Sequence, residues 1–165
     1  MINARYRGAR TLVVEGNPYR AAKAIKLGAE RVFDPTHPDV LKQVLDAAGG
    51  AGVDKAVECS GVPAAHRLCI DAARRRGQVA FVGETYAYGQ TPLAISPDMI
   101  RKGLTLKGSW HYNLARYDAL MRVIVESRAQ LDELITHRLE MSQVQQALEI
   151  SASGQCAKIV LDPWK

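Results

Sequence analysis

The first residue in this chain that could do chemistry is Glu15, which ends the apolar run TLVVE at residues 11–15. Such a run predicts a buried strand, and in a sheet of parallel strands ligands bind at the carboxyl ends. A carboxylate at that point can accept hydrogen bonds from both hydroxyls of an adenosine ribose and would repel a 2′-phosphate, so it favours NAD over NADP. The alternative is an ordinary solvated residue in a loop between a strand and a helix.

The glycine loop that accompanies such an acid is not found before Glu15. A GxGxxG loop turns tightly, lets the backbone approach a pyrophosphate and opens a helix, and it lies about 20 residues before the acid. Only 14 residues precede Glu15. The GGAG run at residues 49–52 follows a predicted helix and precedes a predicted strand, so we interpret it as a helix stop with a turn. We therefore expect the beginning of the fold to lie outside this chain.

Two later strands end in residues that could contact a flat ring. The runs VECSG at 57–61 and FVGE at 81–84 both end in small or flexible residues. Gly61 and Gly83 could let a ring approach the backbone, because glycine has no Cβ. The alternative is a plain exit from a strand into a loop.

The run LKGSWHYN at residues 106–113 is more distinctive. Gly108 and Ser109 precede a cluster of bulky polar and aromatic side chains. His111 taken alone is better explained as a hydrogen-bonded structural histidine than as a proton carrier.

The histidines and cysteines are not spaced as metal ligands. Histidines at positions 37, 66, 111 and 137 show no HExxH-like spacing, and cysteines at 59, 69 and 156 form no CxxC pair. We expect no metal site built only from this chain, and neither a GxSxG elbow nor a P-loop occurs. We interpret the cysteines as ordinary buried thiols. No catalytic residue is predicted.

Short apolar strands alternate with helical patterns along the chain. Strands are predicted over residues 11–15, 31–34, 55–61, 78–84, 104–110 and 157–164, with a short edge strand and turn within 91–100. Helices are predicted over 18–29, 38–50, 63–77, 114–129 and 141–154, the last with Ser142 as its N-cap. This alternation indicates the α/β class, as an incomplete doubly wound parallel sheet with helices on both faces.

Composition indicates one domain over residues 1–165. The chain is 47% hydrophobic and carries a net charge of +5, from 22 Lys and Arg against 17 Asp and Glu. The excess is scattered, and its densest run, RRR at 74–76, falls at a predicted helix end where cations complement the dipole. We therefore expect no nucleic-acid partner. With no 18-residue apolar run and a charged N-terminal segment, we expect no membrane partner and a cytoplasmic location.

Five runs, in the same order, resemble the C-terminal, nucleotide-binding part of zinc-dependent medium-chain alcohol and polyol dehydrogenases. They are TLVVEGNPYRAAKAIKLGAERVFDP, GVDKAVECSGVPAA, RRRGQVAFVGE, LTLKGSW and ITHRLEMSQVQQALEISASGQCAKIVL. The resemblance covers essentially the whole chain. It implies a Rossmann-like fold and an oxidoreductase that transfers hydride between an alcohol and NAD.

The resemblance also implies cofactor-binding roles for individual residues. Glu15 would hold the adenosine ribose, with Arg20 beside it. Cys59 and Ser60 would line the adenine side, and Lys158 matches a basic position that reaches the pyrophosphate.

Three further residues match the nicotinamide end of the cofactor site. Val82 and Ser109, with His111 nearby, would offer backbone groups to the carboxamide. The segment from Leu93 to Ser96 matches an edge strand that pairs antiparallel with its twin across the two-fold axis of a dimer.

The family has parts that this sequence does not contain. An N-terminal domain supplies the catalytic zinc ligands, and residues 111–165 would pack on it. The first Rossmann strand and its glycine loop are also missing, and MINARYRGAR resembles the end of the helix that follows the loop, with Gly8 as its C-cap. The missing strand is central, so TLVVE and KAVECS would lose a shared partner. These strands must then pair with each other, be bridged by another chain, or remain a fragment of a longer protein. We expect the chain to self-associate as a homo-oligomer.

The sequence therefore predicts the nucleotide-binding portion of an NAD-dependent dehydrogenase, a truncated domain without turnover by itself. Zinc is implied for the full-length family only. The alternative is a non-catalytic oligomeric scaffold or binding module derived from that family.

Overall fold

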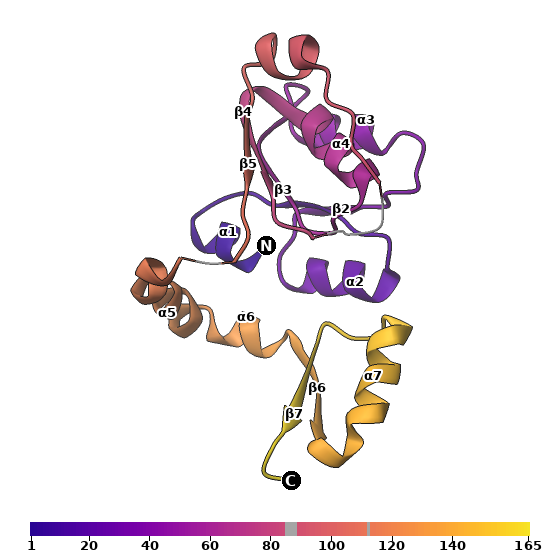
Figure 1. Ribbon diagram of the computed structural model, residues 1–165, viewed down its shortest axis with the longest axis vertical. Helices are drawn as coiled ribbons and strands as arrows, with labels where there is room; N and C mark the ends of the chain where they lie inside the picture. The colour runs from indigo at the N-terminus through magenta and orange to yellow at the C-terminus, as the bar shows by residue number, and fades with distance from the viewer. Residues whose placement is uncertain (85–88, 112) are drawn as a thin grey trace. The chain divides into compact units, whose positions relative to one another are not determined.

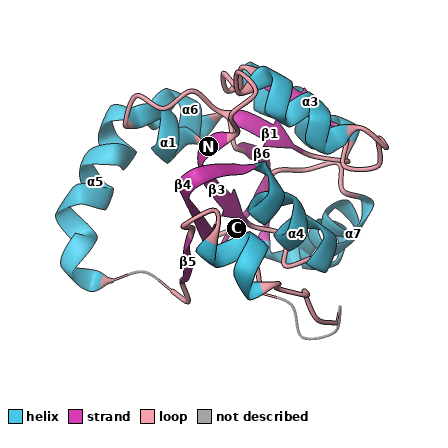
Figure 2. Cartoon of the chain, turned by 90° about the horizontal axis from the view of Figure 1, so that it is seen from above, coloured by secondary structure: helices cyan, strands magenta, loops and turns pink. Residues whose placement is uncertain are grey.

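The chain folds as an α/β protein in which every paired strand is parallel (Figures 1 and 2). The computed structural model describes residues 1–84, 89–111 and 113–165. It contains two compact units, the first formed by Met1–Asp34 with Leu114–Lys165 and the second by Pro35–Asn113. The predicted α/β class with parallel strands is confirmed. Within these described residues, the strands form three short sheets, one in the second unit and two in the first.

The N-terminal part of the first unit contains two helices and one parallel strand pair. The elements are α1 (Ile2–Tyr6), β1 (Leu12–Val14), α2 (Pro18–Lys26) and β2 (Arg31–Phe33). The β1 and β2 strands pair in register, with Val13 opposite Val32. Helix α2 begins where the Asn17 side chain accepts a hydrogen bond from the Arg20 amide at 3.1 Å, as an N-cap residue does. These elements match the predicted strands and helix.

The C-terminal part of the first unit contains short helices and a second parallel pair. The elements are η2 (Leu114–Arg116), α5 (Tyr117–Glu126), α6 (Arg128–Asp132), β6 (Ile135–Glu140), η3 (Met141–Gln143), α7 (Val144–Ser153) and β7 (Lys158–Asp162). The helix predicted over 114–129 is interrupted at Ser127. Ser142 as N-cap is wrong, because a capping box between Glu140 and Gln143 starts the single turn η3, and α7 follows.

Polar contacts join these two parts of the first unit. The Asn17 side chain donates to the Gly154 carbonyl at 3.2 Å, which links the start of α2 to the end of α7. Lys26 lies 2.7 Å from the Glu133 carboxylate. Segments more than 100 residues apart in sequence are thereby held together.

The second unit is built on a three-stranded sheet of order β3-β4-β5. Its elements are α3 (Val40–Ala47), β3 (Val53–Glu58), α4 (Pro63–Ala72), β4 (Ala73–Phe81), the π-helix η1 (Ile95–Ile100) and β5 (Thr105–Gly108). Helix α4 packs on β3 and β4, and α3 packs on α4. The core consists of Ile70, Ala73, Val79 and Leu104.

The arginine run at 74–76 does not end a helix. Helix α4 ends at Ala72, and the arginines belong to β4, where Ala73 pairs with Val53. The cation at the end of α4 is instead Lys102, whose Nζ donates to the carbonyls of Ile70 and Asp71 at 2.9 Å and of Ala73 at 3.1 Å. A lysine distant in sequence therefore caps the helix.

The strand predicted from Leu93 to Ser96 is wrong for its second half. Helix η1 begins at Ile95, and Asp98 in this helix accepts a hydrogen bond from the Ala94 amide at 2.8 Å. Arg67 of α4 pairs with the same carboxylate at 2.8 Å. This partly buried ion pair helps to hold the segment as a helix, because a buried Asp98 without a partner would be costly.

Two glycine predictions are confirmed. Gly8 follows α1 with φ +80, and Gly49 and Gly50 follow α3 with φ +79 and +85. These left-handed conformations suit glycine and end both helices. The GGAG run is therefore a helix stop with a turn.

Strands β1 and β3, which were predicted to lose a shared partner, each pair on one edge only. Strand β1 pairs with β2 and β3 pairs with β4, and no other strand of the described residues pairs with either. Among residues 1–84, 89–111 and 113–165, no helix has the length and apolar character needed to cross a bilayer.

Candidate functional site

Glu15 lies directly after β1, at the carboxyl end of the β1-β2 pair. Its carboxylate accepts hydrogen bonds from the Asn17 amide at 2.8 Å and from the Arg20 guanidinium at 3.1 and 3.2 Å. The structure therefore brings Glu15 and Arg20 together, both within the loop and first turn that connect β1 to α2. The Glu15 side chain is 25% exposed, which leaves it accessible from solvent.

Glu15 is held in its charged form. Burial of the carboxyl would raise its pKa, but hydrogen bonds from Arg20 and the Asn17 amide, with the guanidinium charge, together lower the pKa below its ordinary value. An ionised carboxylate is an acceptor only. Hydroxyl groups can therefore bind to Glu15 by displacing Arg20, whereas a phosphate would be repelled by Glu15 and attracted by Arg20.

Lys158 is an exposed residue at the start of β7, in the same unit as Glu15. Its backbone carbonyl accepts a hydrogen bond from the Thr136 hydroxyl at 3.3 Å. Lys158 is the first residue of β7, at the amino end of its strand, whereas Glu15 follows the carboxyl end of β1.

The second unit places three predicted residues on one sheet edge. Glu58 pairs with Phe81, and Phe81 pairs with Gly108, so the three strands end side by side. The next residues along the chain are Cys59, Val82 and Ser109. Parallel pairing alone brings them together, since strands that run in one direction end at one edge.

The amides of this edge are already used by the sheet. Val82 donates its N–H to the Glu58 carbonyl at 2.9 Å, and Ser109 donates to the Phe81 carbonyl at 3.0 Å. The backbone groups that Val82 and Ser109 could offer to a ligand are thus their carbonyl oxygens. His111 lies beyond this edge, exposed, with φ +32 and its ring edge-on to Trp110 at 5.0 Å.

Glu58 was not singled out from the sequence. It is 2% exposed, and its carboxylate accepts hydrogen bonds from the Ser60 amide at 2.7 Å and the Gly61 amide at 3.0 Å. The Ser60 hydroxyl also donates to it. The sequence signal was present, since an acid two residues before Ser60 repeats the spacing of Glu15 and Asn17. Both glutamates accept from the amide two residues later.

Burial and hydrogen bonding act in opposite directions on Glu58. Burial raises its pKa, but hydrogen bonds from the Ser60 side chain and from the amides of Ser60 and Gly61 outweigh this, and the pKa lies below its ordinary value. The His66 Nε2 atom lies 3.4 Å from the same carboxylate. Glu58 is therefore a buried acceptor for the turn after β3.

Gly83 does not leave room for a ring. A Cβ on Gly83 would lie 2.3 Å from the Gly61 nitrogen and 2.7 Å from the Ser60 nitrogen. The prediction that a ligand approaches the backbone at Gly83 is wrong, because the turn after β3 fills this space. Glycine at position 83 is a packing requirement.

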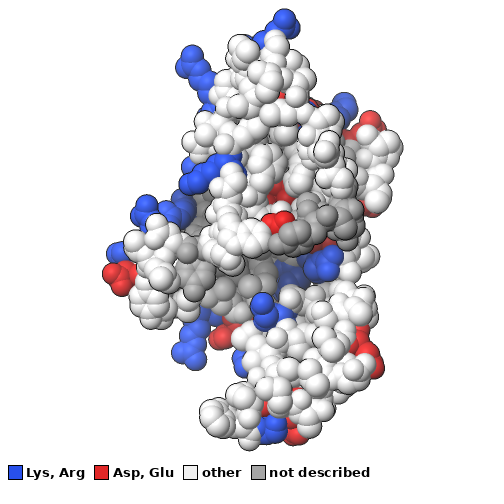
Figure 3. Space-filling view, in the orientation of Figure 1, with Lys and Arg blue, Asp and Glu red and all other residues white. Residues whose placement is uncertain are grey.

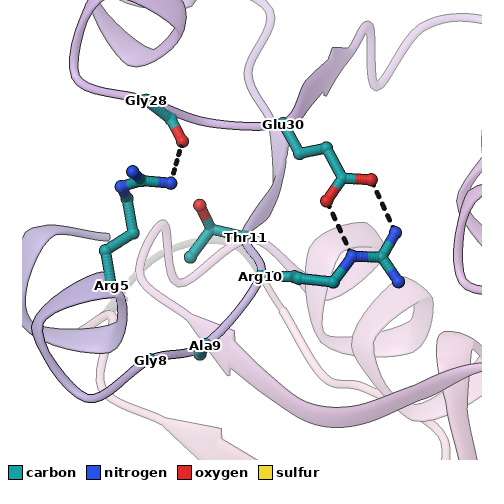
Figure 4. A pocket seen from close by; sticks show the side chains of 7 residues that line it. All are labelled: Arg5, Gly8, Ala9, Arg10, Thr11, Gly28 and Glu30. Atoms are coloured by element: carbon teal, nitrogen blue, oxygen red, sulfur yellow. Dashed lines mark hydrogen bonds and ion pairs between the residues drawn. The ribbon is translucent and has the colours of Figure 1, made fainter.

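A shallow cavity of about 420 Å³ lies at the opposite, amino end of β1 and β2 (Figure 4). Its lining residues are Arg5, Gly8, Ala9, Arg10, Thr11, Gly28 and Glu30. Both arginines are engaged, Arg10 with the Glu30 carboxylate and Arg5 with the Gly28 carbonyl. Less than 1 Å² of the Thr11 hydroxyl oxygen is accessible, so a molecule in the cavity cannot reach it. We therefore do not place the site here.

The side chains that could hold a metal are dispersed. Nowhere in the described residues do three or more His, Cys, Asp or Glu side chains come together as a metal site. The prediction of buried thiols is wrong for Cys59, which is exposed, while Cys69 and Cys156 are half-buried. Burial raises the pKa of Cys69 to about 11, so this thiol stays protonated at neutral pH.

Positive charge is not concentrated on the face drawn in Figure 3. Lys and Arg side chains are scattered there among uncharged residues and do not gather in one patch. Several basic side chains of the described residues are paired with acids, as Lys42 is with Asp46 at 2.7 Å and Arg74 with Asp54 at 2.6 Å.

Comparison with known proteins finds a family model, curated proteins and solved structures that are all described as dehydrogenases. The family model described as zinc-binding dehydrogenase matches residues 1–126. The L-threonine 3-dehydrogenase of Symbiobacterium thermophilum is 31% identical over 169 residues, covering 97% of this chain and 46% of that protein. Alcohol dehydrogenase 1 of Artemisia annua is 32% identical, with 96% and 43% covered.

A solved alcohol dehydrogenase from Thermotoga maritima superimposes with a TM-score of 0.87 at 26% identity, over 97% of this chain and 45% of that one. The chain thus spans a little under half the length of these relatives.

The packing at Gly83 predicts a large effect of a single methyl group. Gly83→Ala should lower the free energy of unfolding by about 3 kcal/mol, because the Cβ would overlap backbone atoms that cannot move aside. Gly108→Ala is the control, since Gly108 ends the neighbouring strand with nothing within 4 Å of a built Cβ, and should change it by less than about 0.5 kcal/mol. Urea denaturation measures both, and equal stabilities would contradict the packing.

Proposed function

This chain belongs to the zinc-binding dehydrogenase family, and on that premise we propose that it is the nucleotide-binding portion of an NAD-dependent alcohol or polyol dehydrogenase. The observation that carries the proposal is the ionised Glu15 carboxylate at the carboxyl end of β1, next to Arg20. When bound, the cofactor exchanges a hydride with the alcohol carbon. We propose the cytoplasm as the location, because the cysteines are free thiols, and cell fractionation tests it.

In this proposal, Glu15 accepts hydrogen bonds from the adenosine ribose hydroxyls. These hydroxyls replace the Arg20 hydrogen bonds at 3.1 and 3.2 Å, while the Asn17 amide keeps the carboxylate in place. Arg20 is then free to turn toward the phosphates. Lys158 is the second proposed phosphate contact, in keeping with its charge.

The second unit contributes acceptors and apolar contacts in the same proposal. The carbonyl oxygens of Val82 and Ser109 accept from the carboxamide NH₂ group, since their amides are used in the sheet. His111 flanks that end, and the turn at Cys59 and Ser60 contacts the adenine. These assignments follow from the sequence resemblance and from the common sheet edge.

The residues present do not form the zinc site that the family name implies. In residues 1–84, 89–111 and 113–165, the potential ligands are too dispersed to hold a metal ion. We therefore derive no step through zinc from this chain. Its proposed role is limited to binding and orienting the dinucleotide.

The proposal predicts that Glu15 sets the cofactor preference. Titration with NADH, followed by nicotinamide fluorescence, should saturate at lower concentration than titration with NADPH. Glu15→Gln should reduce the ratio of the two affinities by about 10-fold, because it removes the charge that repels a 2′-phosphate and frees Arg20 to bind one.

Glu30→Gln is the matched control for this titration. Glu30 is also paired with an arginine in the first unit, Arg10 at 2.7 Å, but it precedes β2 at the opposite end of the strand pair. Glu30→Gln should leave the affinities for NADH and NADPH within about 2-fold of the wild-type values. No saturable binding by the wild-type chain would overturn the proposal.

We further propose that these 165 residues bind the cofactor without oxidising alcohols. In a mixture of the chain, zinc, NAD and a simple primary or secondary alcohol, the absorbance of NADH should not rise above that of a protein-free blank. Any reproducible increase that disappears when the alcohol is left out would refute this.

A non-catalytic oligomer is the second candidate, favoured by the single-sided pairing of β1 and β3. Val57 of β3 is 61% exposed, although strands of parallel sheets are usually covered on both faces. We propose self-association through β3.

Light scattering should then give the mass of a dimer or larger oligomer. Val57→Lys should shift the mass toward the monomer, whereas Val125→Lys, at a position of α5 that is 68% exposed, should not. A monomeric wild-type chain would contradict self-association, and an oligomer that fails to bind NADH would favour the scaffold over the dehydrogenase portion.

A further inference from the structure

The turn after β3 is held by a single buried side chain. The Glu58 side chain is 1% exposed, and its carboxylate accepts from the amides of Ser60 and Gly61 and from the Ser60 hydroxyl. Three donors on one carboxylate fix the course of the backbone through residues 59–61. A buried carboxylate with this many hydrogen bonds is costly to disturb, because its removal leaves each of these donors without a partner.

The main chain of Glu58 also fixes the neighbouring strand end. Its carbonyl oxygen accepts from the Val82 amide at 2.9 Å and from the Gly83 amide at 3.1 Å. Gly83 in turn lies against the backbone of Ser60 and Gly61 with no space for a Cβ. Glu58 thus joins the ends of β3 and β4 through its side chain and its main chain together.

His66 supports the carboxylate from α4. Its Nε2 atom lies 3.4 Å from Glu58, and its other ring nitrogen, Nδ1, lies 2.7 Å from the Thr91 hydroxyl. The ring stands edge-on to Phe81 with centroids 5.3 Å apart. The imidazole is therefore held on three sides, and it keeps Glu58 beneath the turn.

We propose that Glu58 is a positioning residue for the dinucleotide. Its buried carboxylate holds the turn of Cys59, Ser60 and Gly61 in the conformation that receives the adenine half of the cofactor. Glu58 is buried beneath this turn and acts through it. A site residue held by a buried partner in this way is already in its binding conformation before the ligand arrives, which lowers the cost of binding. This inference rests on the proposed NAD binding.

The experiment compares the affinity of Glu58 variants for NADH and for ADP-ribose, which lacks the nicotinamide. Glu58→Ala should weaken both by about 10-fold or more, and by the same factor, because the turn serves the adenine half that both share. Glu58→Gln retains one acceptor oxygen, so it should lose less affinity for both ligands than Glu58→Ala. It takes the place of Glu58→Ala in the titrations if that variant does not fold. All titrations are made at a temperature at which each variant is fully folded by circular dichroism.

Asp98→Asn is the matched control. Asp98 is another buried carboxylate of the second unit that accepts a hydrogen bond from a backbone amide, that of Ala94, but it belongs to helix η1 and does not bond to the turn at residues 59–61. Asp98→Asn should lower the stability of the chain by about as much as the Glu58 variants do. It should leave the affinities for NADH and ADP-ribose within about 2-fold of the wild-type values. Hydrogen exchange should show faster exchange of the Ser60 and Gly61 amides in the Glu58 variants only.

The outcomes separate the two proposals. If the wild-type chain binds neither NADH nor ADP-ribose, the proposed function fails and this inference fails with it. If the wild-type chain binds both, and the Glu58 variants bind as well as Asp98→Asn, the inference alone is overturned. Loss of NADH affinity without loss of ADP-ribose affinity would also overturn it, because the turn would then not serve the adenine half.

Discussion

A parallel strand that stops at a sheet edge leaves the amides of the following loop without a partner strand, and the structure of this chain depends on how those amides are satisfied. Two strands solve the problem in the same way. Glu15 after β1 and Glu58 at the end of β3 each accept a hydrogen bond from the amide two residues later, at 2.8 and 2.7 Å. In both places the carboxylate replaces the missing partner strand, and the loop leaves the sheet with a defined course.

The two glutamates differ in what surrounds them, and this separates their roles. Glu15 is a quarter exposed and forms an ion pair with the half-exposed Arg20, so its carboxylate can exchange one partner for another. Glu58 is buried against His66, and its acceptor positions are filled by the turn that it holds. One carboxylate is therefore available to a ligand, whereas the other stabilises the backbone on which a ligand would rest. Two side chains of the same type can take different roles because their exposure and their hydrogen-bond partners differ.

Helix ends in this chain are also held by hydrogen bonds from side chains that are distant in sequence. Lys102 caps α4 by donating to the carbonyl of Ile70, 32 residues earlier, and Asn17 connects the start of α2 with the end of α7. These contacts satisfy backbone groups that a helix cannot satisfy internally. Each compact unit is consequently held by a few polar contacts between remote segments as well as by its apolar core, and its loops are placed by these contacts.

Periodicity and the order of strands and helices were sufficient to predict the α/β class, most of the elements, and Glu15 at a strand end, whereas Arg20 beside Glu15 was implied by the family resemblance. These features are local, because the spacing of apolar residues, a proline at a helix start and a glycine after a helix act within a few residues. The tertiary structure decided the rest. It ended α4 before the arginine run, turned the segment after Ala94 into a helix around Asp98, and filled the space at Gly83 with the turn after β3. It also buried Glu58 under that turn, although its sequence spacing repeats that of Glu15 and Asn17. Burial and the choice of a hydrogen-bond partner depend on segments far apart in the sequence, so they could be known only once the chain had folded.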